Sequence, residues 1–507
     1  MPSTIPDLFD DAVAAAPSKV WLHVDGRTFT FEEAHALVGR AASAVAARGV
    51  RPGDLVLATA RNTPEYLLAW LGTVYAGAII VAVNPGAGET ELAGLVRQVR
   101  PRLVVTDSEA PDSVRNAGGD TVEVAALYRE PADATPPRPG PDDPAALIPT
   151  SGTTGRSKLV TQTHRAYAMA GEGFPWWMEL GPDDRLMTSL PLFHINAPAY
   201  SVLGSVAARA GLVLLPRFSA STFLDSARRH GATEFNAIGA MLEILMRQPV
   251  REDDGDTPLR LCYTGPAPPE ARQREMEHRF GLRIVCGYAL SESPYGMIWP
   301  RGTRPFGTLG TVRQHPRLGA VNEARVVAGG RAVADGEVGE LELRSPAVMR
   351  GYWDMPEETA EAVDPEGWLR TGDLVHRNAD GTYTFVGRKK EVIRRRGENV
   401  APAEIEEALC THADVNEAAV IGVPSELTEE EVKGFVAVSD PDSADLAAIR
   451  EAAAALLTPF KVPRYLEAVA ELPHTPTGRV AKHELPRERT AAETDFDEAR
   501  DRVQRAG

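Results

Sequence analysis

Residues 150–158 read TSGTTGRSK, and they follow directly on the apolar run 145–149 (AALIP). The apolar run predicts a buried strand, so the polar stretch is expected to leave the end of that strand as a loop. Small hydroxyl side chains and two glycines let backbone amides and hydroxyls converge on an anion, and Lys158 adds a positive charge. Because the spacing is not GxxxxGK[ST], a Walker-type phosphate loop is disfavoured. A segment like this, standing alone, is also compatible with a solvated glycine–serine turn.

The chain around this loop alternates short β-branched runs with alanine-rich helical stretches. The expected strands include 55–58, 78–83 and 103–106, and the expected helices include 31–48 and 89–99. Alternating segments of this kind predict an α/β fold, with parallel or mixed sheets flanked by helices. Active-site loops of such folds lie at the carboxyl ends of the strands.

The second half of the chain changes pattern twice. From about Leu318, strands separated by turns predict a β-rich subdomain, and from Gly387 a compact pattern of strands and helices begins again. We therefore expect a large N-terminal domain, residues 1–386, and a small α+β C-terminal domain, residues 387–507.

Composition excludes several classes of protein. The 507 residues include 71 acidic and 54 basic side chains, a net charge of −17, which disfavours nucleic-acid binding through bulk electrostatics. The three cysteines form no CxxC pair, so neither a disulfide framework nor a cysteine-rich metal site is expected. The N-terminus lacks the basic and apolar regions of a signal peptide, and no apolar run is long enough to span a membrane. These features predict a cytoplasmic protein with no membrane or nucleic-acid partner. The expected oligomeric state, a monomer or a homodimer, does not follow from composition.

Further motifs follow the loop in a fixed order. They are 191–197 (PLFHINA), 265–268 (GPAP), 287–293 (GYALSES), 368–374 (WLRTGDL), 387–400 (GRKKEVIRRRGENV), 460–463 (FKVP) and 473–478 (PHTPTG). With this ordered set, the sequence resembles the adenylate-forming superfamily of acyl- and aryl-CoA synthetases, peptide-synthetase adenylation domains and luciferases. Within it, the chain looks most like the crotonobetaine/carnitine-CoA ligase group. The resemblance implies activation of a carboxylic acid by ATP as an acyl-adenylate, release of pyrophosphate, and transfer to CoA with release of AMP.

The resemblance also implies roles for individual residues around ATP. Ser291 would contact the α-phosphate, Glu292 would hold Mg²⁺, and Tyr288 would stack on adenine. Asp373 would accept the ribose hydroxyls, with Arg388 as a second ribose contact. The residues that would surround the phosphates are Thr150, Ser151, Gly152, Thr153, Thr154, Gly155 and Lys158, and those expected elsewhere along the nucleotide and CoA are Gly265, Pro266 and Gly397.

The acid pocket and the hinge are implied in the same way. The residues expected to line the pocket are His194, Asn196, Gly239 and Trp299, although a buried histidine or tryptophan is also compatible with ordinary packing. Lys390 matches the position about which the small domain of the family turns between two half-reactions.

The sequence departs from the family in the phosphate loop, at Ser157 and Leu159, in residues 289–291, and at the C-terminal lysine. The lysine that reaches the reacting carboxylate normally follows Thr-Gly, and here it is Arg479, with Lys482 three residues further on. Arginine keeps the charge but replaces a compact ammonium with a planar fork. The primary hypothesis is an AMP-forming acyl-CoA ligase. The alternatives are an adenylating enzyme that uses an amine or carrier thiol, including nitrite-dependent diazotisation of aryl amines, and a non-catalytic nucleotide-binding relative.

Overall fold

The computed structural model describes residues 4–87, 89–107, 120–129, 136–150, 158–265, 267–395, 398–425, 430–475 and 480–496. By its internal contacts the chain divides into two compact units. The first comprises Met1–Arg325 with Glu342–Thr371, and the second comprises Val326–Leu341 with Gly372–Gly507. The sequence predicts a domain boundary after residue 386 and a hinge near Lys390. Both concern how the small domain moves, which a division by internal contacts does not test, so both stay predictions.

Two large sheets form the first unit, and the described residues of the smaller one make seven strands. In spatial order these are β19 (Gly351–Tyr352), β8 (Lys158–Thr163), β7 (Pro144–Thr150), β4 (Ile79–Ala82), β3 (Leu55–Thr59), β5 (Leu103–Thr106) and β6 (Asp120–Glu123). The strands from β7 to β6 run parallel, whereas β8 is antiparallel to both β7 and β19. The carboxyl end of β7 therefore lies at the same edge as those of β4 and β3.

The larger sheet has nine strands within the described part of the chain. They are β15 (Thr311–Val312), β14 (Ser293–Ile298), β13 (Arg283–Leu290), β12 (Leu261–Thr264), β11 (Glu234–Asn236), β9 (Arg185–Thr188), β10 (Gly211–Leu214), β1 (Val20–Val24) and β2 (Arg27–Thr30). Pairing from β13 through β1 is parallel, and both ends of the sheet are antiparallel.

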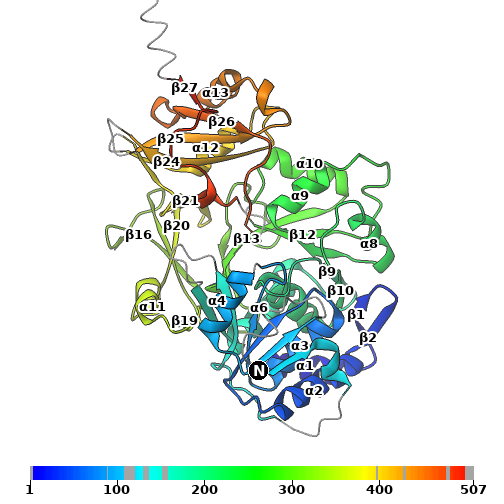
Figure 1. The fold of residues 1–507 in the computed structure, drawn as a ribbon. Helices are drawn as coiled ribbons and strands as arrows, with labels where there is room; N and C mark the ends of the chain where they lie inside the picture. Colours follow the sequence, from blue (N-terminus) through cyan, green and yellow to red (C-terminus); the bar gives the residue numbers. More distant parts are fainter. Residues whose placement is uncertain are drawn as a thin grey trace, which may run out of the picture. The chain divides into compact units, whose positions relative to one another are not determined.

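Helices surround these sheets. Within the described residues, the α-helices of the first unit are α1 (Ile5–Ala15), α2 (Phe31–Ala47), α3 (Pro64–Tyr75), α4 (Glu89–Val99), α6 (His164–Met178), α7 (Leu203–Ala208), α8 (Phe223–His230), α9 (Gly239–Met246), α10 (Glu270–Phe280) and α11 (Pro356–Ala362). Helices α1, α2 and α3 pack against one another (Figure 1). Helix α2 begins where the sequence predicts, because Thr30 and Glu33 form a reciprocal capping box.

The boundary between the units falls within a sheet whose described strands are β17 (Arg331–Ala332), β16 (Glu323–Ala328), β18 (Val338–Arg344), β20 (Leu369–Arg377) and β21 (Tyr383–Arg388). The rest of the second unit contains the β22–β23 pair and the sheet β24–β25–β26–β27. Its elements are β22 (Ile393–Arg395), β23 (Glu398–Val400), α12 (Pro402–Leu409), β24 (Glu417–Pro424), β25 (Glu430–Ala437), α13 (Leu446–Ala454), β26 (Tyr465–Val469) and β27 (Thr494–Asp495). Helices α12 and α13 pack on each other around a separate apolar core. The predicted α/β architecture with a small α+β unit is confirmed.

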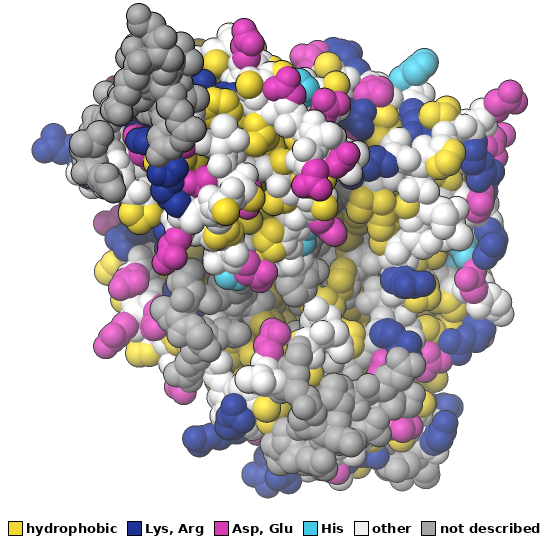
Figure 2. Space-filling view, turned by 45° about the horizontal axis from the view of Figure 1, so that its top comes forward, with side chains coloured by type: hydrophobic (Ala, Val, Ile, Leu, Met, Phe, Trp, Pro, Cys, Tyr) yellow, Lys and Arg dark blue, Asp and Glu magenta, His cyan; other side chains and the backbone are white. Residues whose placement is uncertain are grey.

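The surface agrees with the composition. Figure 2 shows acidic and basic side chains interspersed over the face in view. Among the helices that the structure describes, none is both long and apolar enough for a membrane crossing.

Candidate active site

The two ends of the predicted phosphate loop, Thr150 and Lys158, lie opposite each other on neighbouring strands. Strands β7 and β8 pair in antiparallel register, with Thr150 opposite Lys158, and the Thr150 hydroxyl donates to the Lys158 carbonyl at 3.2 Å. The predicted phosphate contacts at Ser151, Gly152, Thr153, Thr154 and Gly155 lie outside the described residues. Both anchors of the loop are thus fixed at the carboxyl end of β7, the edge at which ligands bind in α/β sheets.

Tyr352 joins Lys158 to Glu292. The Lys158 ammonium lies over the Tyr352 ring, 4.7 Å from its centre, and the Tyr352 hydroxyl donates to Oε1 of Glu292 at 3.0 Å. Burial, together with the Glu292 carboxylate beside it, raises the pKa of Tyr352, so the hydroxyl keeps its proton as a donor. Sequence reasoning missed Tyr352, although the segment following Met349 (RGYW) lies between two of the quoted motifs.

The Ser291–Glu292 pair occupies the turn between β13 and β14, where Leu290 pairs with Ser293. Two hydrogen bonds hold its backbone: the Gln162 amide donates to the Ser291 carbonyl at 2.6 Å, and the Met349 N–H donates to the Glu292 carbonyl at 2.7 Å. Contacts with Gln162 of β8 and with Tyr352 thus connect Ser291 and Glu292 to the strand that begins at Lys158, and the phosphate and metal roles of these residues stay predictions.

The predicted contacts next to this turn lie on two neighbouring strands. Tyr288 belongs to β13, opposite Met297, and Gly265 follows the end of β12. A side chain at Gly265 would meet the Gly287 carbonyl at 2.4 Å, so only glycine allows this approach. Pro266 lies outside the described residues.

The predicted pocket residues lie on three segments. Asn196 accepts a hydrogen bond from the Asn236 amide at 2.7 Å, and His194 packs against Phe193 with 4.5 Å between ring centres. Gly239 is the first residue of α9.

Trp299 is the most strongly packed of the predicted pocket residues. It is buried, its indole N–H donates to the Thr308 carbonyl at 2.9 Å, and its ring packs against Phe306. These contacts are those of a core tryptophan, so the structure gives its pocket role no separate support.

The second unit holds the predicted ribose contacts. Asp373 and Arg388 are register partners in β20 and β21, and the Arg388 guanidinium pairs with the Asp373 carboxylate at 3.1 Å. Asp373 is buried, whereas the Arg388 side chain is 43% exposed. The ion pair places the two predicted ribose contacts side by side, and their role at the ribose stays a prediction.

Ion pairs flank the predicted hinge. Lys389 binds Glu340 of β18 at 2.7 Å, and Glu391 binds Lys482 at 2.7 Å, so the residues on either side of Lys390 are held by different elements of the second unit. Lys482 also pairs with Glu406 at 2.8 Å. Burial lowers the pKa of Lys482, but the two carboxylates outweigh burial and the pKa lies above its usual value. Gly397 and Arg479 lie outside the described residues.

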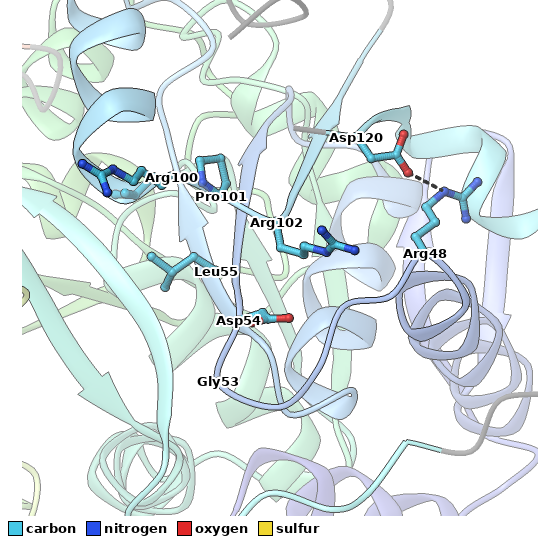
Figure 3. A pocket seen from close by; sticks show the side chains of 9 residues that line it. Arg48, Gly53, Asp54, Leu55, Arg100, Pro101, Arg102 and Asp120 are labelled. Atoms are coloured by element: carbon cyan, nitrogen blue, oxygen red, sulfur yellow. Dashed lines mark ion pairs between the residues drawn. The ribbon is translucent and has the colours of Figure 1, made fainter. Parts of the chain in front are cut away.

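A large hollow of about 710 Å³ lies away from these groups (Figure 3). Its lining includes Arg48, Asp54, Leu55, Arg102 and Asp120. Leu55 and Asp120 are the first residues of β3 and β6, so the hollow lies at the amino ends of the strands, opposite to the edge from which the β7–β8 loop leaves. Its position does not fit the predicted nucleotide site.

Comparison with known proteins agrees with this fold. The chain matches the AMP-binding enzyme family over residues 9–353 and the AMP-binding enzyme C-terminal domain over residues 404–479. It belongs to this family, and the predicted membership of the adenylate-forming superfamily is confirmed.

Individual relatives are similar over almost their whole length. The chain is 34% identical to sulfoacetate–CoA ligase of Cupriavidus necator, over 95% of this chain and 98% of the relative. It is 30% identical to crotonobetaine/carnitine–CoA ligase of Salmonella agona, over 90% and 93%. Its fold matches the crystal structure of ATP-bound MatB from Rhodopseudomonas palustris with a TM-score of 0.87 at 28% identity, covering 95% and 98% of the two chains.

Proposed function

We propose that this chain activates a carboxylic acid with ATP, forms an acyl-adenylate with release of pyrophosphate, and transfers the acyl group to CoA with release of AMP. Family membership and two relatives named as CoA ligases support this proposal. The observation that carries it is the contact of Lys158, Tyr352 and Glu292 at the base of the β7–β8 loop.

Lys158 and Glu292 have different roles at the phosphates of ATP. The Lys158 ammonium balances charge on the phosphate oxygens, and the hydroxyl of Thr150 lies at the other anchor of the loop. Mg²⁺ is commonly held by one or two carboxylates plus substrate phosphates, and Glu292 fits this role because the Tyr352 hydroxyl occupies only Oε1. When bound, Mg²⁺ would neutralise the charge that develops on the leaving pyrophosphate.

The chain then orients the nucleotide and the acid. Ser291 binds the α-phosphate and Tyr288 stacks on adenine, whereas Asp373 and Arg388 bind the ribose. Because phosphoryl chemistry needs little covalent help, holding these groups in line supplies most of the acceleration. Arg479 supplies the positive charge of the family's lysine, and the residues after Lys390 turn as a unit before thioester formation.

The test is release of AMP and pyrophosphate across a panel of carboxylic acids and nitrite, with CoA, with an amine or with neither. Thioester and AMP formed only with CoA support the proposal. AMP formed with an amine or without CoA supports an enzyme with another acceptor. Glu292→Ala and Lys158→Ala should abolish AMP formation. No AMP under every condition, or normal turnover in either variant, would contradict the proposed chemistry.

A further inference from the structure

Glu340 of β18 holds two neighbouring segments with one carboxylate. Its Oε1 accepts a hydrogen bond from the Gly372 N–H at 3.1 Å, and its Oε2 accepts one from the Lys389 ammonium at 2.7 Å. Gly372 lies in β20 and Lys389 directly follows β21, so the contact joins three successive strands of one sheet within the second unit. The Lys389 side chain is 62% exposed and that of Glu340 only 12%, so the shielded bond to Gly372 contributes more than the ion pair.

Both of these segments carry a predicted ribose contact. Gly372 immediately precedes Asp373, and Lys389 immediately follows Arg388. Asp373 and Arg388 are themselves register partners, joined by an ion pair of 3.1 Å. Glu340 therefore holds the residue next to each member of this pair.

An irregularity separates this end of the β20–β21 pair from the rest of the two strands. The register shifts between Leu374 and Val375. A bulge changes the direction of the side chains beside it and locally disrupts the ladder. Gly372 has a φ of +74°, a left-handed conformation that favours glycine, so the strand departs from extended geometry there as well. The regular ladder alone does not fix this end of the pair, and Glu340 adds a contact that does.

The chain leaves the sheet directly after Lys389. The Lys389 N–H still donates to a carbonyl of β20 at 2.8 Å, whereas the Glu391 N–H donates back to the Arg388 carbonyl at 2.9 Å, which closes a turn. Beyond that turn, the Glu391 side chain binds Lys482 at 2.7 Å. The predicted hinge residue, Lys390, thus lies between a segment held by β18 and a segment held by Lys482.

We propose that Glu340 is a positioning residue for the nucleotide: it keeps Asp373 and Arg388 aligned on the ribose while the chain beyond Lys390 turns between the two half-reactions. The inference rests on the proposed function and gives a role in it to a residue outside the quoted motifs. The AMP part of the nucleotide stays bound through both half-reactions. Loss of the alignment therefore weakens ATP binding in the first and lets acyl-adenylate escape before it meets CoA in the second.

The variant Glu340→Ala tests this with two readouts. In acid-dependent ATP–pyrophosphate exchange, it should raise KM for ATP by at least about fivefold and change KM for the acid by less than about twofold. In the complete reaction with CoA, the wild type should form equal amounts of AMP and thioester. Glu340→Ala should form more AMP than thioester, because adenylate that escapes is hydrolysed.

The failure of this inference differs from a failure of the proposed function. An unchanged KM for ATP in folded Glu340→Ala would overturn the inference and leave the proposed function intact. No acid-dependent exchange in the wild type would overturn the proposed function, and the inference with it.

Further variants separate the two bonds of Glu340. Glu340→Gln keeps an acceptor for the Gly372 N–H but loses the charge that binds Lys389, so its KM for ATP should lie between those of the wild type and Glu340→Ala. Lys389→Met removes only the exposed ion pair and should raise KM for ATP by about twofold. Combined with Glu340→Ala it should cause no further increase, and a further increase would contradict the inference, because Lys389 would then act on the nucleotide independently of Glu340.

The matched control is Asp335→Asn, which removes a carboxylate that pairs with Arg377 at 3.4 Å, at the other end of β20. It should leave both KM for ATP and the ratio of AMP to thioester unchanged. If Glu340→Ala fails to fold, Glu340→Gln and Lys389→Met take its place. A KM for ATP equal to that of the wild type in both would overturn the inference.

Discussion

Replacing Tyr352 by phenylalanine isolates one hydrogen bond of the candidate site. The variant removes the hydroxyl that donates to Glu292 at 3.0 Å and keeps the ring beneath the Lys158 ammonium. A hydrogen bond to a charged group contributes about 1.5–3 kcal/mol, which corresponds to roughly 10- to 150-fold in rate if it is needed in the transition state. Tyr352→Phe should therefore slow adenylation within this range.

The direction of the effect follows from the role of Glu292. Without the Tyr352 donor, the Glu292 carboxylate can rotate. A smaller fraction of molecules then has the carboxylate in the orientation that binds Mg²⁺. We expect ATP–pyrophosphate exchange to need more Mg²⁺ for half-maximal rate, with KM for the acid unchanged. Tyr352→Leu also removes the cation–π contact, which contributes about 0.5–2 kcal/mol, and should be slower again.

A matched control is Tyr128→Phe, which removes a hydroxyl that donates to the Glu65 carbonyl at 2.6 Å, away from the Lys158–Tyr352–Glu292 contact. It should leave both the exchange rate and the Mg²⁺ requirement unchanged. Wild-type exchange at limiting Mg²⁺ in folded Tyr352→Phe would refute the assignment of Glu292 as a metal ligand positioned by Tyr352.

Three further perturbations have defined outcomes. Lys482→Met should destabilise the second unit by about 2–3 kcal/mol in urea unfolding, since it leaves Glu391 and Glu406 without their donor; a folded variant without adenylation would instead place Lys482 at the reacting groups. Arg479→Lys should raise the adenylation rate, measured by exchange, and an unchanged rate would argue against contact with the reacting phosphate. Burial lowers the pKa of His164 from 6.5 to about 4, so the unfolded chain binds the proton first and stability falls as pH drops from 6.5 towards 4. The loss in the free energy of unfolding approaches about 3 kcal/mol at the acid end of this range. When the free energy of unfolding is measured at pH 7 and at pH 5, its decrease should be smaller in His164→Leu than in the wild type.

Local sequence signals predicted the elements that carry the site. Four elements begin within one residue of their expected positions: the strand before residue 150, helix α2, and the strands at residues 55 and 103. Runs of apolar residues and helix caps are properties of a short stretch of sequence, so they can be read without the fold. The pairing of Asp373 with Arg388 depends on the register of two strands, and no pattern within either strand specifies that register.

Tyr352 and Glu340 show why the rest could not be predicted. Tyr352 lies in a two-residue strand, and its partner Lys158 is 194 positions away in the sequence. An isolated glutamate is usually solvated, and nothing around residue 340 indicates that its carboxylate would bind both Gly372 and Lys389. Both sets of contacts follow from tertiary packing that brings distant segments together.

One strand, β8, accounts for the convergence of the site. Lys158, its first residue, fixes the end of the loop from β7, and Val160 pairs with Tyr352 of β19 on the other side. Two residues further, the fully buried Gln162 holds the Ser291 carbonyl and thereby the turn that contains Glu292. The end of β7, the turn at Glu292 and strand β19 are thus positioned by alternate residues of a single strand. Because β8 is antiparallel to both neighbours, its start meets the end of β7 and the turn after Tyr352 at one edge, and this strand, more than any single motif, makes the candidate site possible.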